Sequence, residues 1–175
     1  MYVLAEKIGR VKVTKTSETP VSKQDSVIHS TFSIGRTYPQ PPARVFFAHA
    51  NEAMKRRWLA EGEGWTVNKF TLDFRVGGSE ISRFRYLDGP EITYDAIIQD
   101  IVPNRRIVFA YRMAVGSNPI SVSLSTVELV PSGNGTRLTY TEQGAYFDDA
   151  DAPKSREEGS RGLLEKLAEE LDHSR

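Results

Sequence analysis

From residue 65 to residue 144, apolar side chains recur at every second position, and short turns rich in glycine, proline and asparagine interrupt this pattern at strand-length intervals. A period of two is typical of strands that place one face in a core and the other in water. Because successive strands joined by short turns pair antiparallel, the pattern predicts a meander. The six predicted strands span residues 66–76, 80–87, 92–102, 106–115, 121–130 and 136–143.

A further strand and two short helices are predicted to precede the meander. The strand spans 27–34, where apolar residues again alternate, and a cluster of prolines ends it. Since proline is tolerated in the first turn of a helix, the first helix is predicted over 43–50. Asn51 is the predicted N-cap of the second helix, which Gly62 and Gly64 end.

The last predicted element is a helix over 153–172, long enough to cover the apolar face of the sheet, so the predicted class is α+β. Its apolar stripe consists of Leu163, Leu164, Leu167, Ala168 and Leu171. Continued toward the N-terminus, the stripe reaches Gly159, Ser160 and Arg156 rather than large apolar residues. Two interpretations stay open, namely close contact between helix and sheet or an empty volume beside Gly159.

Length and composition exclude several classes of protein. The 175 residues fit a single domain over 26–175, preceded by a flexible polar extension over 1–25, for which an added edge strand is the alternative. With 23 basic and 23 acidic residues, the chain has no charge excess for a nucleic-acid partner. The absence of cysteine excludes disulfides and thiolate nucleophiles. Since no apolar run approaches the ~20 residues of a membrane span and no signal peptide is evident, we expect a cytoplasmic protein.

The sequence predicts neither a metal nor a cofactor. Its three histidines, His29, His49 and His173, are far apart and lack metal-ligand spacing, and no phosphate-binding glycine motif is present. We expect His29 and His49 at the surface or half-buried. The basic run from Lys55 to Arg57 is interpreted as a solvated helix face, with contact to an acidic ligand at a pocket mouth as the alternative.

Glu142 is the candidate polar group of a pocket, because it is in phase with Tyr140 on the last strand. We favour exposure to water at the rim of the sheet. If the side chain instead faces inward, it needs a partner, for which Arg83, Arg85 and Arg112 are candidates. It would then orient a ligand held otherwise by apolar contacts.

Eight aromatic residues are spaced to share largely one face of the sheet: Trp58, Phe70, Phe74, Phe84, Tyr94, Phe109, Tyr111 and Tyr140. Aromatic residues at strand spacing are most often ordinary core. Buried tyrosine hydroxyls nevertheless need hydrogen-bond partners, which a cavity can offer through water or a polar ligand group. The aromatic set therefore favours a pocket without proving one.

Five segments together resemble the START-like (SRPBCC) superfamily, and more closely its branch named for the activator of the heat-shock-protein ATPase. They are Phe74-Arg-Val-Gly-Gly78, Thr37-Tyr-Pro39 with Pro42-Ala-Arg-Val-Phe46, Asp100-Ile-Val-Pro-Asn-Arg-Arg-Ile-Val108, Thr136-Arg-Leu-Thr-Tyr-Thr-Glu-Gln-Gly144, and Arg156-Glu-Glu-Gly-Ser160 ahead of Leu163. The resemblance extends over about residues 27–171. It implies a helix-grip fold, in which a curved sheet and the C-terminal helix enclose a hydrophobic cavity.

The resemblance and the residues together predict binding of a small hydrophobic molecule without catalysis. The predicted ligand-binding residues are Trp58, Phe74, Phe84, Tyr94, Tyr111, Tyr140, Glu142, Gly159, Leu163 and Leu167. A cyclase- or aromatase-like enzyme using Glu142 is one alternative, and a co-chaperone-like interaction module with an exposed apolar patch is another. Because the extension over 1–25 is too short and polar to be the co-chaperone's separate N-terminal domain, we do not carry that activity over. A weak homodimer stays open.

Overall fold

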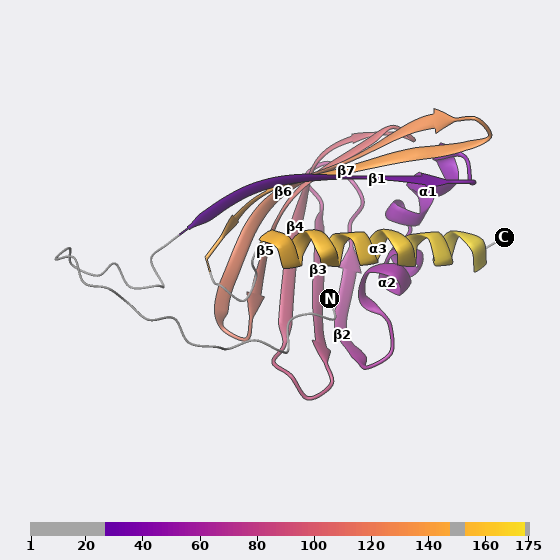
Figure 1. Ribbon diagram of the computed structural model, residues 1–175. Coiled ribbons are helices and arrows are strands. Elements are labelled where there is room, and N and C mark those ends of the chain that lie inside the picture. The colour runs from indigo at the N-terminus through magenta and orange to yellow at the C-terminus, as the bar shows by residue number, and fades with distance from the viewer. Residues whose placement is uncertain (1–26, 148–152, 174–175) are drawn as a thin grey trace.

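A computed structural model describes residues 27–147 and 153–173, and the predicted extension over 1–25 lies outside them. Within these residues the chain forms seven strands and three helices (Figure 1). The strands are β1 (Ile28–Tyr38), β2 (Trp65–Leu72), β3 (Ser79–Tyr86), β4 (Ile92–Val102), β5 (Arg106–Val115), β6 (Asn118–Ser132) and β7 (Gly135–Tyr146). The helices are α1 (Pro42–Ala50), α2 (Glu52–Ala60) and α3 (Pro153–His173).

All seven strands form one antiparallel sheet in the order β1-β7-β6-β5-β4-β3-β2. The strands β2 to β7 are the predicted meander, and β1 pairs along the whole of β7, from Ile28 opposite Tyr146 to Tyr38 opposite Thr136. Since β1 and β2 lie at opposite edges, α1 and α2 carry the chain from one edge of the sheet to the other.

The long helix α3 runs across the concave face of the curved sheet, with α1 and α2 near its C-terminal end (Figure 1). It buries Leu164, Leu167 and Leu171 of the predicted stripe, together with the polar residues Arg156 and Ser160. Among the described residues, no helix combines the length and the apolar character that a membrane span requires. The α+β helix-grip architecture predicted from the sequence is therefore the observed one.

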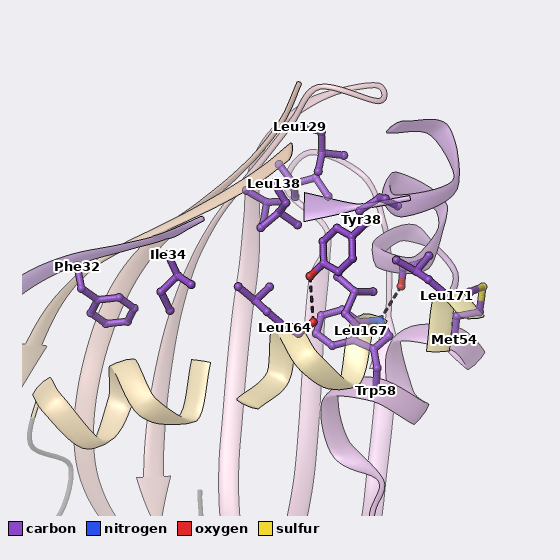
Figure 2. Packing of buried hydrophobic residues seen from close by; sticks show 14 residues of the cluster. Phe32, Ile34, Tyr38, Met54, Trp58, Leu129, Leu138, Leu164, Leu167 and Leu171 are labelled. Atoms are coloured by element: carbon purple, nitrogen blue, oxygen red, sulfur yellow. Dashed lines mark hydrogen bonds between the residues drawn. The ribbon is translucent and has the colours of Figure 1, made fainter. Parts of the chain in front are cut away.

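The hydrophobic core fills the region where α1, α2 and the C-terminal half of α3 meet the sheet (Figure 2). Two hydrogen bonds fasten these layers: the Tyr38 hydroxyl donates to the Leu164 carbonyl oxygen at 3.0 Å, and the Trp58 indole nitrogen donates to the Ala48 carbonyl oxygen at 2.9 Å. Because the core is concentrated at this end, the N-terminal half of α3 covers a different, less densely filled part of the sheet.

Most predicted boundaries hold to within a few residues, and the N-cap is confirmed because the Asn51 side chain accepts a hydrogen bond from the Met54 amide at 3.0 Å. The strand predicted over 66–76 is too long, since β2 ends at Leu72. Asp73 and the residues after it form a tight turn in which the Gly78 amide donates to the Arg75 carbonyl oxygen at 2.8 Å. The apolar alternation in the sequence continues past the end of β2 because Phe74 lies in this turn and packs against the hydrophobic core.

Candidate functional site

A cavity of about 190 Å³ lies between the sheet and the N-terminal half of α3. Seven of the ten predicted ligand-binding residues line it: Trp58, Phe84, Tyr94, Tyr111, Tyr140, Gly159 and Leu163. A Cβ added at Gly159 would meet no atom within 4 Å outside its own helix backbone. Of the two interpretations of Gly159, the structure therefore favours empty volume over close contact with the sheet.

The other three predicted residues do not line the cavity. Phe74 lies after the end of β2 and packs edge-on against Phe46, with ring centroids 5.6 Å apart. Leu167 is fully buried in the hydrophobic core. Glu142 lies next to the cavity and contacts its lining residues without lining it itself.

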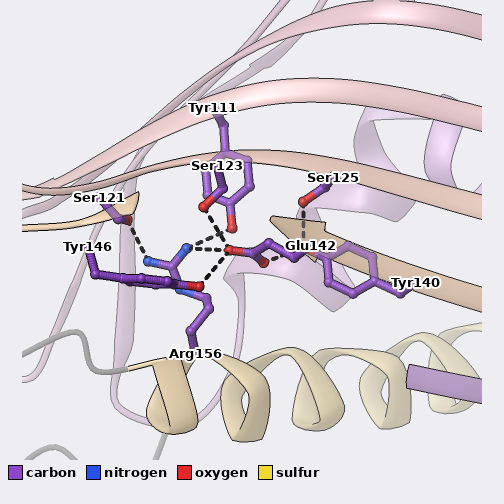
Figure 3. A network of polar contacts seen from close by, with 8 residues as sticks. All are labelled: Tyr111, Ser121, Ser123, Ser125, Tyr140, Glu142, Tyr146 and Arg156. Atoms are coloured by element: carbon purple, nitrogen blue, oxygen red, sulfur yellow. Dashed lines mark hydrogen bonds and ion pairs between the residues drawn. The ribbon is translucent and has the colours of Figure 1, made fainter. Parts of the chain in front are cut away.

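Glu142 is completely buried and forms an ion pair with Arg156 of α3, with 3.1 Å between Oε1 and Nη1 (Figure 3). Three hydroxyls also donate to its carboxylate: Ser123 at 2.8 Å, Tyr140 at 2.7 Å and Tyr146 at 3.4 Å. A buried carboxylate is tolerated when it has such partners. The expected exposure of Glu142 at the rim of the sheet is therefore wrong. Its partner is Arg156 and not one of the three expected candidates, Arg83, Arg85 and Arg112.

Like Glu142, Arg156 has several hydrogen-bonding partners. Its guanidinium donates to the Tyr111 hydroxyl at 2.7 Å and to the Ser121 hydroxyl at 2.8 Å, and it lies 5.6 Å from the ring centroids of both Tyr111 and Tyr146. We call this group the Arg156 network, which consists of Tyr111, Ser121, Ser123, Ser125, Tyr140, Glu142, Tyr146 and Arg156 (Figure 3). No buried side-chain nitrogen or oxygen of the network lacks a hydrogen-bond partner within the described residues.

Small residues on β6 and β7 make room for this network. Three serines of β6 at alternate positions, Ser121, Ser123 and Ser125, face inward, each opposite a larger residue of β5. On β7, a Cβ at Gly144 would lie 2.7 Å from the Tyr146 hydroxyl, so a glycine is needed there for the ring to fold back. Burial is the main cause that raises the pKa of Tyr111 and of Tyr140, which keeps both hydroxyls protonated.

A second buried ion pair joins Lys55 of α2 and Glu80 of β3. Lys55 lines the cavity, with its Nζ 5.5 Å from the centroid of the Phe109 ring. The expected solvated position of Lys55 is therefore wrong. Unlike the Arg156 network, this region contains buried polar atoms without a partner in the described residues, namely Glu80 Oε1, Ser82 Oγ and His49 Nε2.

His49, at the end of α1, is buried and lines the cavity, so its expected surface or half-buried position is wrong as well. Its ring packs edge-on against Trp58, with centroids 5.0 Å apart. Burial, reinforced by the positive charge of Lys55, lowers the pKa of His49 to about 3. The imidazole is therefore neutral at pH 7 and can donate or accept a hydrogen bond.

Tyr94 of β4 completes this side of the cavity. It is the cross-strand neighbour of Ser82, and the charge of Glu80 adds to the burial that raises its pKa. No residue of the described chain forms a hydrogen bond with the Tyr94 hydroxyl. We call His49, Lys55, Glu80, Ser82 and Tyr94 the Lys55 cluster. Within the described ranges, no group of three histidine, aspartate or glutamate side chains is arranged to hold a metal ion.

Sequence reasoning missed most of the polar side chains around the cavity. The signal for Arg156 was its place on the apolar stripe of α3, where a charged residue needs a buried partner. Lys55 carried a similar signal, since it lies one helical turn from the core residue Trp58. The alternating serines of β6 marked a row of small inward-facing side chains opposite aromatic residues.

The comparisons with known proteins agree with this architecture. The sequence profile of the family described as "Activator of Hsp90 ATPase homolog 1-like protein" matches residues 39–172. A crystal structure from Rhizobium loti is 65% identical over 83% of this chain and 99% of that one, with a TM-score of 0.77. A structure from Rhizobium leguminosarum is 38% identical, covers 85% and 98% of the two chains, and has a TM-score of 0.81. No curated protein matches the sequence significantly.

Proposed function

The chain belongs to the family of Activator of Hsp90 ATPase homolog 1-like proteins, and from this premise we propose that it binds a small, mainly apolar molecule in the cavity under α3. The single observation that supports this proposal is the cavity itself. Its walls are mostly aromatic and aliphatic side chains, and its two charged regions lie at its sides. This combination of an apolar lining with few polar groups is characteristic of ligand sites.

The volume limits the ligand to a small molecule. An engineered apolar cavity of about 150 Å³ holds benzene, so about 190 Å³ accepts one ring with a short substituent. Apolar contacts between a ligand and the aromatic and aliphatic walls remove apolar surface from water, which makes binding favourable.

The enzymatic alternative has less support. Glu142 was the candidate acid–base group, and its carboxylate is occupied by Arg156 and three hydroxyls (Figure 3). It supports the cavity wall by holding Tyr140 in place. Catalysis by a group that must exchange protons with a substrate requires direct reach, which this arrangement does not provide.

Filling the cavity should abolish binding. We expect Gly159→Leu to lower the affinity for toluene at least tenfold, because its side chain would enter the space that the ring occupies. The matched control is Gly162→Leu on the exposed side of the same helix, where the added side chain also meets no neighbour and does not reach the cavity. Both changes replace glycine in a helix, so their effects on helix propensity are alike.

Toluene binding can be measured by isothermal titration calorimetry and by the rise in thermal unfolding temperature. The Gly162→Leu protein should bind like the unchanged protein. If the unchanged protein binds neither toluene nor benzene, or if Gly159→Leu binds toluene normally, the cavity is not the ligand site.

A further inference from the structure

We infer that the molecule bound in this cavity is neutral and carries a hydroxyl group, which is held by the Lys55 cluster. This inference rests on the proposed function and adds the chemical class of the ligand. It starts from the contrast between the two polar regions of the cavity.

The Arg156 network is complete without a ligand, whereas the Lys55 cluster is not. In the first, each buried polar side-chain atom has a protein partner within the described residues. In the second, three buried atoms have none: His49 Nε2, Glu80 Oε1 and Ser82 Oγ. A buried polar atom without a partner costs about 1–3 kcal/mol. Of the three residues, His49 lines the cavity, so a ligand there can complete the hydrogen bonding of its Nε2.

Three of the five residues of the cluster are placed where a ligand can reach them, whereas Glu80 and Ser82 do not line the cavity. His49, Lys55 and Tyr94 all line the cavity, and they come from α1, α2 and β4 respectively. Tyr94 also presents a hydroxyl that has no hydrogen bond with the described residues. Its ring packs at a tilt against Tyr111, with centroids 4.9 Å apart, so it lies in the apolar wall between the two polar regions.

The chemistry of these groups selects a hydroxyl. Among the residues that line the cavity, Tyr94 and Lys55 supply O–H and N–H donors, the Tyr94 oxygen can also accept, and a neutral imidazole donates or accepts at Nε2. A group that both donates and accepts satisfies such a mixed set, and a hydroxyl does both. A carbonyl or ether oxygen only accepts, so it could not donate to an imidazole Nε2 that carries no proton.

The charges around the cavity exclude an anion. Lys55 is paired with Glu80, and Arg156 is paired with Glu142, so each buried cation already has its counter-charge. A carboxylate ligand would bring a further negative charge into an apolar space without a free cation to offset its desolvation. A neutral alcohol or phenol meets no such penalty.

Toluene, phenol and benzoate test this inference, because the first two differ only by a methyl or hydroxyl group on the same ring. A purely apolar cavity would favour toluene strongly, since a buried hydroxyl without a partner loses its hydration. We expect phenol to bind at least as tightly as toluene and at least tenfold more tightly than benzoate. The dissociation constants can be measured by isothermal titration calorimetry.

Isosteric variants then locate the hydroxyl. Tyr94→Phe and His49→Phe should each shift the preference toward toluene about fivefold or more, as expected for the loss of one hydrogen bond. Tyr86→Phe is the matched control: it also removes a tyrosine hydroxyl, but from an exposed residue that does not line the cavity, and should change the preference less than twofold. Circular dichroism confirms that each variant is folded.

The outcomes separate this inference from the proposed function. If toluene and phenol both fail to bind, the proposed function fails and this inference with it. If toluene binds and is preferred tenfold or more over phenol, the cavity binds ligands but the hydroxyl assignment is wrong. The hydroxyl assignment is also wrong if neither Tyr94→Phe nor His49→Phe alters the preference. If benzoate binds as tightly as phenol, the inference that the ligand is neutral is wrong.

Discussion

Glu142→Gln is expected to reduce the free energy of unfolding by about 3–5 kcal/mol, the range found when one partner of a buried ion pair is removed. The glutamine leaves the Arg156 guanidinium buried at an apolar wall without its counter-charge, and it replaces one acceptor oxygen with a donor among three hydroxyls. Urea unfolding followed by tryptophan fluorescence measures the change. An exposed carboxylate on the neighbouring strand provides the control, and Glu128→Gln should alter stability by less than about 0.5 kcal/mol.

The double variant Glu142→Gln with Arg156→Met distinguishes pairing from simple burial. Because both charges are then gone, the double variant should lose clearly less stability than the sum of the two single variants, with a coupling of about 2 kcal/mol or more. Losses that simply add would mean that Glu142 and Arg156 stabilise the fold independently. The ion pair would then not be what holds the N-terminal part of α3 against the sheet.

The architecture could be predicted from the sequence because it follows from local patterns. Alternating apolar residues and turn signals indicate the strands whatever lies around them, and the stripe from Leu163 to Leu171 indicates which side of α3 faces the sheet. The empty volume beside Gly159 was one of two interpretations that the sequence left open, because a glycine on a buried stripe permits either close contact with the sheet or unfilled space. These inferences need no knowledge of which elements meet.

The polar partners could not be predicted for the opposite reason. Whether Glu142 pairs with Arg156 or with Arg112 depends on which elements meet, and in the structure Arg112 lies on the other face of the sheet with Asp95. Lys55 is similar, since its burial depends on Glu80 across the cavity edge. The position of a residue in the periodic pattern of its own strand or helix indicates which face its side chain is on. The partners that the side chain meets on that face depend on tertiary packing.

His49 should make the stability of the protein depend strongly on pH. The fold holds its pKa at about 3, through burial and the nearby Lys55 charge, whereas an unfolded histidine has a pKa near 6.5. Below pH 6.5 the unfolded chain therefore binds a proton that the folded chain does not, so the free energy of unfolding falls as the pH falls. The decline approaches about 1.4 kcal/mol per pH unit and levels off below about pH 3.

Comparison with His49→Phe isolates this contribution, because carboxylates titrate alike in both proteins. Between pH 7 and pH 4 the unchanged protein should lose about 3 kcal/mol more stability than the variant, which has no imidazole to protonate. At pH 7 the two should differ by no more than about 1 kcal/mol, since the phenyl ring can keep the packing on Trp58 and removes a polar atom without a partner.

Urea unfolding at half-unit pH steps gives both curves. His29→Gln is the control, because that histidine is exposed on β1, and it should retain the full pH dependence of the unchanged protein. Parallel curves for the unchanged protein and His49→Phe would show that the imidazole takes up its proton equally well in the folded state. The ring would then have access to water, and a buried, neutral His49 could not be one of the groups that complete the hydrogen bonding of a ligand at the Lys55 cluster.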